Sequence, residues 1–251
     1  MQFFQNEGVE LAYLTEGKGD PVLLIHGFAS SAFVNWVQPG WVQTLTDAGY
    51  SIIAIDNRGH GASQKLHETA VYTPERMAGD ARALLDHLGI SSAHVMGYSM
   101  GARISAFLAL SAPDRVHSLV LGGLGMGLIH GVGDWDPIAD ALLAPDASAV
   151  TDPRGKMFRD FADRTKSDRL ALAACIRTSR SEITEEQARS MTQPVLVGVG
   201  TKDDLAGDAH ELAALFPNGR AVDIPGRDHM LAVGDRVFKK AVIEFLAENP
   251  L

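Results

Sequence analysis

Cysteine is nearly absent from this chain, which has one, Cys175, among 251 residues. A single cysteine cannot form an internal disulfide, so we expect a reducing compartment, the cytoplasm. Cys175 lies in an apolar, helix-like run, which favours a buried small side chain over a nucleophile. The first residues lack the basic and then apolar segments of a secretory signal. No apolar run reaches the length that spans a bilayer.

Positive charge is also scarce. Lys and Arg number 22 against 31 Asp and Glu, which gives a formal net charge of −9. This acidity disfavours nucleic acids and anionic membranes as partners. No cluster of His, Cys and Asp has metal-ligand spacing, so we expect no metal. The glycine-rich run 122–127 resembles a dinucleotide-binding loop, but Leu128 stands where the last glycine is required, and we expect no cofactor. Oligomeric state stays open.

Apolar runs of strand length alternate with longer amphipathic stretches. Near-continuous apolar runs are typical of strands buried on both faces of a parallel sheet, and the alternation predicts an open α/β sheet with helices on both sides. We expect strands at residues 9–15, 21–26, 51–56, 93–98, 116–122, 194–200 and 220–224. We expect helices at 36–48, 74–88, 99–111, 208–216 and 235–248.

Residues 124–193 interrupt this alternation, because they contain no clear buried strand. They hold several helical pieces and two turns that contain proline. A simple crossover between parallel strands needs only one helix, so we interpret the segment as a helical cap inserted into a core of residues 1–123 and 194–251. Its apolar residues would either line an acyl pocket or pack the cap against the sheet.

The pentapeptide Gly97-Tyr98-Ser99-Met100-Gly101 follows an apolar strand and precedes a helix-like run. A G-x-S-x-G pattern in that setting predicts a nucleophile elbow, in which a strained turn exposes the serine hydroxyl. The two glycines lack the side chains that would collide in such a turn. Gly-rich strand-to-helix turns without a catalytic serine also exist, so the interpretation depends on further residues.

A serine hydroxyl needs a base and an acid to become a nucleophile. Among nine histidines, His229 has the best context, a polar glycine-containing loop between a short strand and the last helix. The carboxylate is expected from Asp203 or Asp204, which directly follow the buried strand 194–200, at the edge where open α/β sheets bind ligands. The chemistry of the two residues does not separate them, and one is expected to form or cap a turn.

Acyl transfer also requires two backbone donors for the developing oxyanion. One is expected from Met100, the residue after the nucleophile. The other is expected from the loop after the strand that ends at His26, and we choose the N–H of Phe28. His26 itself is interpreted as structural, because its ring can orient that loop by hydrogen bonding.

With these motifs, the chain resembles the serine hydrolases of the α/β-hydrolase fold along essentially its whole length. The resemblance implies a mostly parallel central sheet flanked by helices, with a helical cap inserted after the sixth strand. It favours Asp203 over Asp204, because the family's acid usually stands three residues after the strand-ending glycine. It also implies structural roles for Asp56, Arg58 and His60, which lie in the segment D-N-R-G-H-G-A-S.

Epoxide hydrolases and dehalogenases of this fold use an aspartate at the elbow, whereas Ser99 indicates acyl transfer. We expect a serine hydrolase of carboxylic esters with small to medium acyl chains. A C–C bond hydrolase, a lactonase and a perhydrolase share the same residues, and a non-catalytic small-molecule receptor is a further alternative. A C–C hydrolase would need a polar clamp for a carboxylate; four arginines are candidates for it: Arg103, Arg159, Arg177 and Arg180.

Overall fold

A single twisted sheet of eight strands forms the centre of the computed structural model, which describes residues 1–251. The strands are β1 (Gln2–Asn6), β2 (Val9–Gly17), β3 (Pro21–Ile25), β4 (Ser51–Ile55), β5 (Ala93–Tyr98), β6 (Val116–Gly122), β7 (Val195–Gly200) and β8 (Gly219–Ile224). The strands β3 to β7 are short and mostly buried runs, as a sheet covered on both faces requires, whereas the edge strand β8 buries only Ile224.

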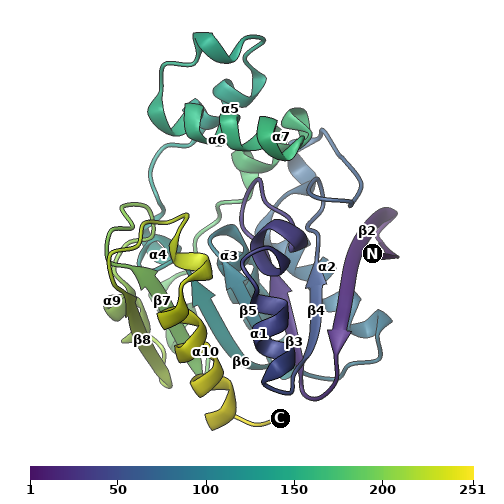
Figure 1. Ribbon diagram of the computed structural model, residues 1–251, viewed down its shortest axis with the longest axis vertical. Helices are drawn as coiled ribbons and strands as arrows, with labels where there is room; N and C mark the ends of the chain where they lie inside the picture. Colours follow the sequence, from purple (N-terminus) through teal and green to yellow (C-terminus); the bar gives the residue numbers. More distant parts are fainter.

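The strand order is β1-β2-β4-β3-β5-β6-β7-β8, and only β1 and β2 run antiparallel to their neighbours. The six remaining strands are parallel, so their carboxyl ends meet at one edge of the sheet (Figure 1). In open α/β sheets this edge is where ligands bind. The mostly parallel sheet flanked by helices confirms the predicted fold class.

Five helices cover the two faces of the sheet. Figure 1 shows α1 and α10 on the near face and α2, α3 and α9 on the far face. Each face carries its own buried cluster of apolar side chains, which the strands separate. The bounds of these helices are α1 (Trp41–Asp47), α2 (Pro74–His87), α3 (Met100–Ser111), α9 (Ala209–Ala213) and α10 (Arg236–Glu248).

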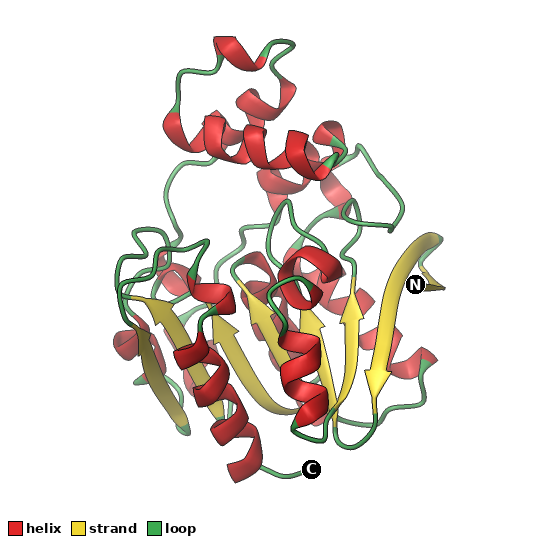
Figure 2. Cartoon of the chain, viewed as in Figure 1, coloured by secondary structure: helices red, strands yellow, loops and turns green.

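Between β6 and β7 the chain forms only helices and loops. The helices are α4 (Gly127–His130), α5 (Asp136–Leu143), α6 (Pro153–Thr165), α7 (Arg169–Thr178) and α8 (Glu185–Ser190). Figure 2 shows a group of these helices beyond the edge at which the parallel strands end. Residues 124–193 are called the helical segment below. No helix of the chain is both long enough and apolar enough to cross a membrane.

Two local expectations differ from the structure. The sequence analysis did not predict strand β1, where Phe4 is the only buried side chain and the apolar signal is correspondingly weak. The helix expected at 36–48 is interrupted by Pro39-Gly40, and Gly40 adopts a left-handed φ of 80°. A π-type turn over Phe33–Val37 precedes this break, and α1 begins only at Trp41.

Candidate active site

Ser99 lies between β5 and α3 in a backbone conformation that residues with a side chain rarely adopt, with φ 54° and ψ −113°. The turn is tight because α3 begins immediately, at Met100. A Cβ on Gly97 would collide with the backbone of Gly101, and one on Gly101 with the carbonyl oxygen of Ile25. The two glycines therefore allow the close approach that holds the Ser99 hydroxyl at the end of the strand.

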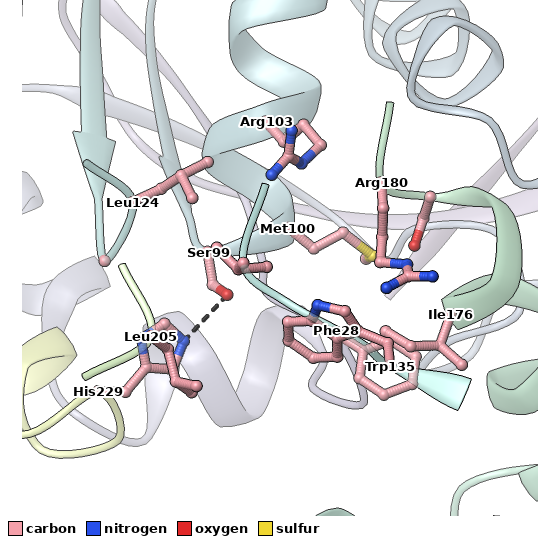
Figure 3. Close-up of a pocket in the computed structure, with 13 residues that line it drawn as sticks. Phe28, Ser99, Met100, Arg103, Leu124, Trp135, Ile176, Arg180, Leu205 and His229 are labelled. Atoms are coloured by element: carbon pink, nitrogen blue, oxygen red, sulfur yellow. Dashed lines mark hydrogen bonds between the residues drawn. The ribbon is translucent and has the colours of Figure 1, made fainter. Parts of the chain in front are cut away.

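The structure brings His229 and Asp203 to this hydroxyl. His229 Nε2 is 3.0 Å from Ser99 Oγ (Figure 3). On the other side of the ring, His229 Nδ1 is 2.7 Å from Asp203 Oδ2. A carboxylate can only accept, so Nδ1–H donates to Asp203, and Nε2 of the neutral ring is left to accept the Ser99 proton. Asp203 has a fully buried side chain, whereas Asp204 is exposed. The geometry thus favours Asp203 over Asp204 as the partner of His229.

Asp203 and the loop of His229 are themselves held in place. Asp203 Oδ1 accepts the backbone N–H groups of Leu205 and Ala206 at 2.9 and 3.1 Å, which orients Oδ2 toward the histidine. The buried Tyr98 hydroxyl donates to the carbonyl oxygen of His229 at 2.6 Å, and the two rings lie 5.6 Å apart. Tyr98 directly precedes the serine, so one residue connects the elbow to the histidine loop.

The loop after β3 is fixed by buried polar contacts. His26 Nδ1–H donates to the carbonyl of Gly27 at 2.7 Å, and His26 Nε2 accepts the N–H of Asn57 at 3.0 Å. The Gly27 N–H donates to Asn35 Oδ1 at 3.0 Å. Burial lowers the pKa of His26 to about 4, so the ring is neutral and serves as both donor and acceptor. These contacts hold Phe28 beside Ser99, as a backbone donor to an oxyanion must be held.

The next loop, after β4, supports the first. Asp56 accepts the N–H groups of Ala32 and Ala62, both at 2.7 Å. Arg58 forms a buried two-point ion pair with Asp80, with both N–O distances 2.7 Å. These contacts match the structural roles that the resemblance implied for the two residues.

His60 also packs into this support. Its ring lies 5.2 Å from that of His26 and 5.9 Å from that of Phe28. Burial, and then the neighbouring His26, lower the pKa of His60 to about 3. The ring is therefore an uncharged packing element beneath the Phe28 loop, not a proton carrier at neutral pH.

Two pockets open on either side of Ser99 and His229. The large pocket has a volume of about 160 Å³ and a mostly apolar lining that includes Val34, Phe158 and Phe161. The small pocket has a volume of about 40 Å³ and is lined by Met100, Leu124 and Leu205 together with polar and cationic side chains. Phe28 and Trp135 line both pockets, as Ser99 and His229 do.

The pockets bring together residues that no sequence motif connects. Trp135, Phe158 and Phe161 belong to the helical segment and face the site, whereas Ile138, Leu142 and Leu172 are buried away from both pockets. Of the four arginines considered for a clamp, Arg103 and Arg180 reach the small pocket, and Arg159 and Arg177 do not. The sequence analysis missed Asn35, Ser179 and the contact of Tyr98 with His229.

Comparisons with known proteins agree with this architecture. A family model described as the alpha/beta hydrolase fold matches residues 20–161. BpoC of Mycobacterium tuberculosis, named a non-heme bromoperoxidase, is 30% identical over 246 residues, which cover 88% of this chain and 91% of BpoC. The solved structure of a hydrolase from Pseudomonas aeruginosa PA01 matches with a TM-score of 0.82 at 27% identity, over 98% of this chain and 97% of that one.

A more distant match shares the fold alone. Est816, solved as an N-acyl homoserine lactone degrading enzyme, has a TM-score of 0.77 at 22% identity, over 98% of this chain and all of that one. The matched residues 20–161 include the elbow and the loops after β3 and β4 but end before Asp203 and His229.

Proposed function

Because the chain belongs to the α/β-hydrolase fold family, we propose that it is a serine hydrolase that cleaves carboxylic esters of small to medium acyl chain. One observation carries the proposal. Ser99 Oγ, His229 and Asp203 form a continuous hydrogen-bonded chain with distances of 3.0 and 2.7 Å. This is the geometry of a nucleophile, a general base and the carboxylate that orients the base.

In the proposed reaction, Ser99 Oγ attacks the ester carbonyl carbon while its proton passes to His229 Nε2. The negative charge that develops on the carbonyl oxygen is stabilised by the N–H groups of Phe28 and Met100. The intermediate then releases the alcohol, which takes its proton from His229, and leaves the acyl group on Ser99. Water, deprotonated by His229, attacks the acyl-enzyme, and the carboxylic acid leaves as the Ser99 hydroxyl is restored.

The large pocket supports the proposed acyl size. Its volume of about 160 Å³ is well below the several hundred Å³ of sites for drug-sized ligands. Its apolar lining gains free energy by removing an alkyl chain from water, by about 0.8 kcal/mol for each buried CH₂. Each added methylene should therefore improve kcat/KM until the pocket is full, after which longer chains should be excluded.

The helical segment would act as the cap of this site. Trp135, Phe158 and Phe161 contribute apolar surface to the large pocket. The Phe158 ring lies 5.5 Å from that of Phe28 and 5.9 Å from that of Trp135. Covering the elbow in this way limits the access of water and strengthens the electrostatic interactions within the site. In this proposal, the sheet supplies the chemistry and residues 124–193 shape the substrate.

The test is the steady-state hydrolysis of p-nitrophenyl esters from acetate to decanoate by the wild type and Ser99→Ala. We expect a maximum at short or medium chains and a loss of at least about 10⁴-fold in kcat for Ser99→Ala. Ser111→Ala, at the exposed end of the same helix, is the matched control and should retain activity. Esterase activity that survives in Ser99→Ala would refute the proposal.

The relative BpoC is named a bromoperoxidase, which is an enzyme that uses hydrogen peroxide. Perhydrolysis, in which peroxide attacks the acyl-enzyme, is therefore a second candidate. Hydrogen peroxide would replace water as the attacker of the same acyl-enzyme, giving a peracid and the free serine. The two reactions separate when the products of one ester are measured with and without peroxide. A peracid yield that exceeds the yield of carboxylic acid at millimolar peroxide would favour the perhydrolase.

A further inference from the structure

The wall of the small pocket formed by the helical segment carries hydrogen-bond donors that have no acceptor. Trp135 Nε1 and Arg180 Nε are buried and make no hydrogen bond in the structure. Ser179 Oγ is also buried, with no nitrogen or oxygen partner. All three residues line the pocket that Ser99 and His229 share, and Figure 3 shows Trp135 and Arg180 among them. Unpartnered buried donors are costly, which makes an acceptor group on a ligand favourable here.

The same pocket is positively charged. Arg103 and Arg180 both line it, and their hydrogen bonds go to uncharged carbonyl oxygens: Arg103 to Gly127, Leu128 and Ser181, Arg180 to Gly133. Neither guanidinium forms an ion pair with a carboxylate of the chain. Burial lowers the pKa of Arg103 to about 10, although the exposed Glu182 opposes this shift, so Arg103 is still a cation at neutral pH. Anionic charge would be stabilised in such a pocket.

The size of the small pocket selects the kind of acceptor. A group the size of a water molecule needs a cavity of about 10–15 Å³. The small pocket, at about 40 Å³, therefore accommodates about three such groups. That is the size of a carboxylate, with its two oxygens and one carbon. A carboxylate also offers four lone-pair sites, enough for the indole N–H, the guanidinium N–H and the serine hydroxyl together.

The large pocket lacks the cationic side chains of the small pocket. Two residues with unpartnered donors line the large pocket, Asn35 and the shared Trp135, but its lining includes no lysine or arginine. Figure 3 shows Arg180 and Trp135 on one side of the small pocket and Ser99 and His229 on the other. The charged wall is therefore within the same pocket as the nucleophile but on its far side.

We propose that the small pocket binds a carboxylate of the substrate through Trp135, Ser179 and Arg180. The substrate class is then an ester with a second, ionised carboxylate a few bonds from the scissile carbonyl, and its uncharged part occupies the large pocket. This inference rests on the proposed ester hydrolysis for the reaction, but the binding of the anion does not depend on it.

The first test compares esters of equal chain length in which a terminal carboxylate replaces a methyl group. In the first pair the difference lies on the acyl side, where monomethyl glutarate has a carboxylate and methyl pentanoate has a methyl group. In the second pair the difference lies on the alcohol side, where 3-acetoxypropanoate has a carboxylate and propyl acetate has a methyl group. We expect kcat/KM for the anionic member to exceed that of its neutral partner at least tenfold in one of the two pairs. That pair identifies the side of the ester bond that enters the small pocket.

The second test assigns the preference to residues. Arg180→Met should lower the ratio of anionic to neutral kcat/KM at least tenfold, and Trp135→Phe, which removes only the N–H and part of the ring, about threefold. Arg177→Met is the matched control, because Arg177 is exposed on α7 and does not line the pocket. It should leave the ratio within twofold. Thermal melting of each variant shows whether it is folded.

Binding to Ser99→Ala separates this inference from the proposed function. Calorimetry should detect monomethyl glutarate or 3-acetoxypropanoate, but not its neutral partner, and Arg180→Met in the Ser99→Ala background should abolish the signal. If this result is obtained while the wild type turns over no ester, the esterase proposal fails and the carboxylate site stands. A wild type that prefers both neutral esters, or an anion preference unchanged by Arg180→Met, would overturn the inference.

Discussion

The edge of the sheet and the helical segment above it both reach the candidate site, but they position their residues differently. Ser99, Asp203 and His229 follow the ends of β5, β7 and β8, and each is fixed by backbone geometry or by buried hydrogen bonds to backbone. Trp135 and Arg180 come from the ends of α5 and α7, and Arg180 has a single hydrogen bond, 3.3 Å long, to Gly133.

This difference indicates a division of roles. The sheet edge holds its three side chains with distances that suit one proton transfer, and a small displacement there would affect every substrate. The helical segment leaves donors of Trp135 and Arg180 without partners, which in our proposal a carboxylate of the substrate satisfies. Substitutions at the sheet edge should therefore lower turnover of all esters, whereas those in the helical segment should change the ranking of esters.

The largest expected effect comes from the carboxylate beside His229. Asp203→Asn should lower kcat by about 10⁴-fold for every ester, because the amide no longer favours the ring tautomer whose Nε2 accepts the Ser99 proton. Asp204→Asn is the matched control and should remain within about twofold, since Asp204 is exposed. Steady-state kinetics with two esters of different charge measures both variants. A larger loss in Asp204→Asn would transfer the role to that residue.

A smaller effect is expected from the link between the elbow and the histidine loop. Tyr98→Phe retains the ring beside His229 but removes the hydroxyl that donates to its carbonyl. We expect kcat to fall about tenfold with KM little changed, because the half-buried His229 loop loses a hydrogen bond worth about 1 kcal/mol and the base is displaced. The ratio of anionic to neutral esters should stay constant. A changed ratio at full turnover would contradict the division of roles.

The last expected effect concerns the stability of the loops under the sheet edge and not turnover. The pKa of His60 is lowered from 6.5 to about 3 by burial, so as pH falls below about 6.5 the unfolded chain takes up a proton that the folded chain refuses. The contribution of His60 to the free energy of unfolding is fully present above pH 6.5. It falls by about 1.4 kcal/mol per pH unit as the pH drops toward 3.

Urea unfolding of His60→Gln between pH 6 and 4.5 tests this linkage. The free energy of unfolding of the variant should change less with pH than that of the wild type, by about 1.4 kcal/mol per pH unit. This difference in slope does not depend on the variant's stability at pH 7. His130→Gln, which alters an exposed histidine of the helical segment, should retain the wild-type slope. Parallel curves for wild type and His60→Gln would show that His60 does not titrate with folding.

The sequence predicted the parts of the molecule that depend on local pattern. Apolar runs marked seven of the eight strands, and the elbow was readable because its glycines and serine are contiguous. Pro39-Gly40 was an available signal for the break before α1. The weak strand β1 was missed because it lies at the sheet edge, with one buried side chain and little apolar periodicity.

The rest of the site depends on packing between distant segments. Asp203 and Asp204 are the same residue type, and only the path of the loop after β7 decides which one is buried against His229. Trp135 and Ser179 are 44 positions apart and meet because α5 and α7 pack together. No spacing rule encodes that meeting, so the donor-lined wall could be found only in the structure.

Arg103 gives the helical segment an unusual kind of attachment. One guanidinium, on the helix that starts at the nucleophile, holds the carbonyls of Gly127 and Leu128 near the start of the segment and that of Ser181 toward its end. Its acceptors are main-chain atoms, which every amino acid provides. Substitution of side chains in the helical segment therefore leaves the acceptors of these Arg103 hydrogen bonds in place. If the proposed function holds, new substrate preferences can evolve without rebuilding the sheet edge that carries Ser99.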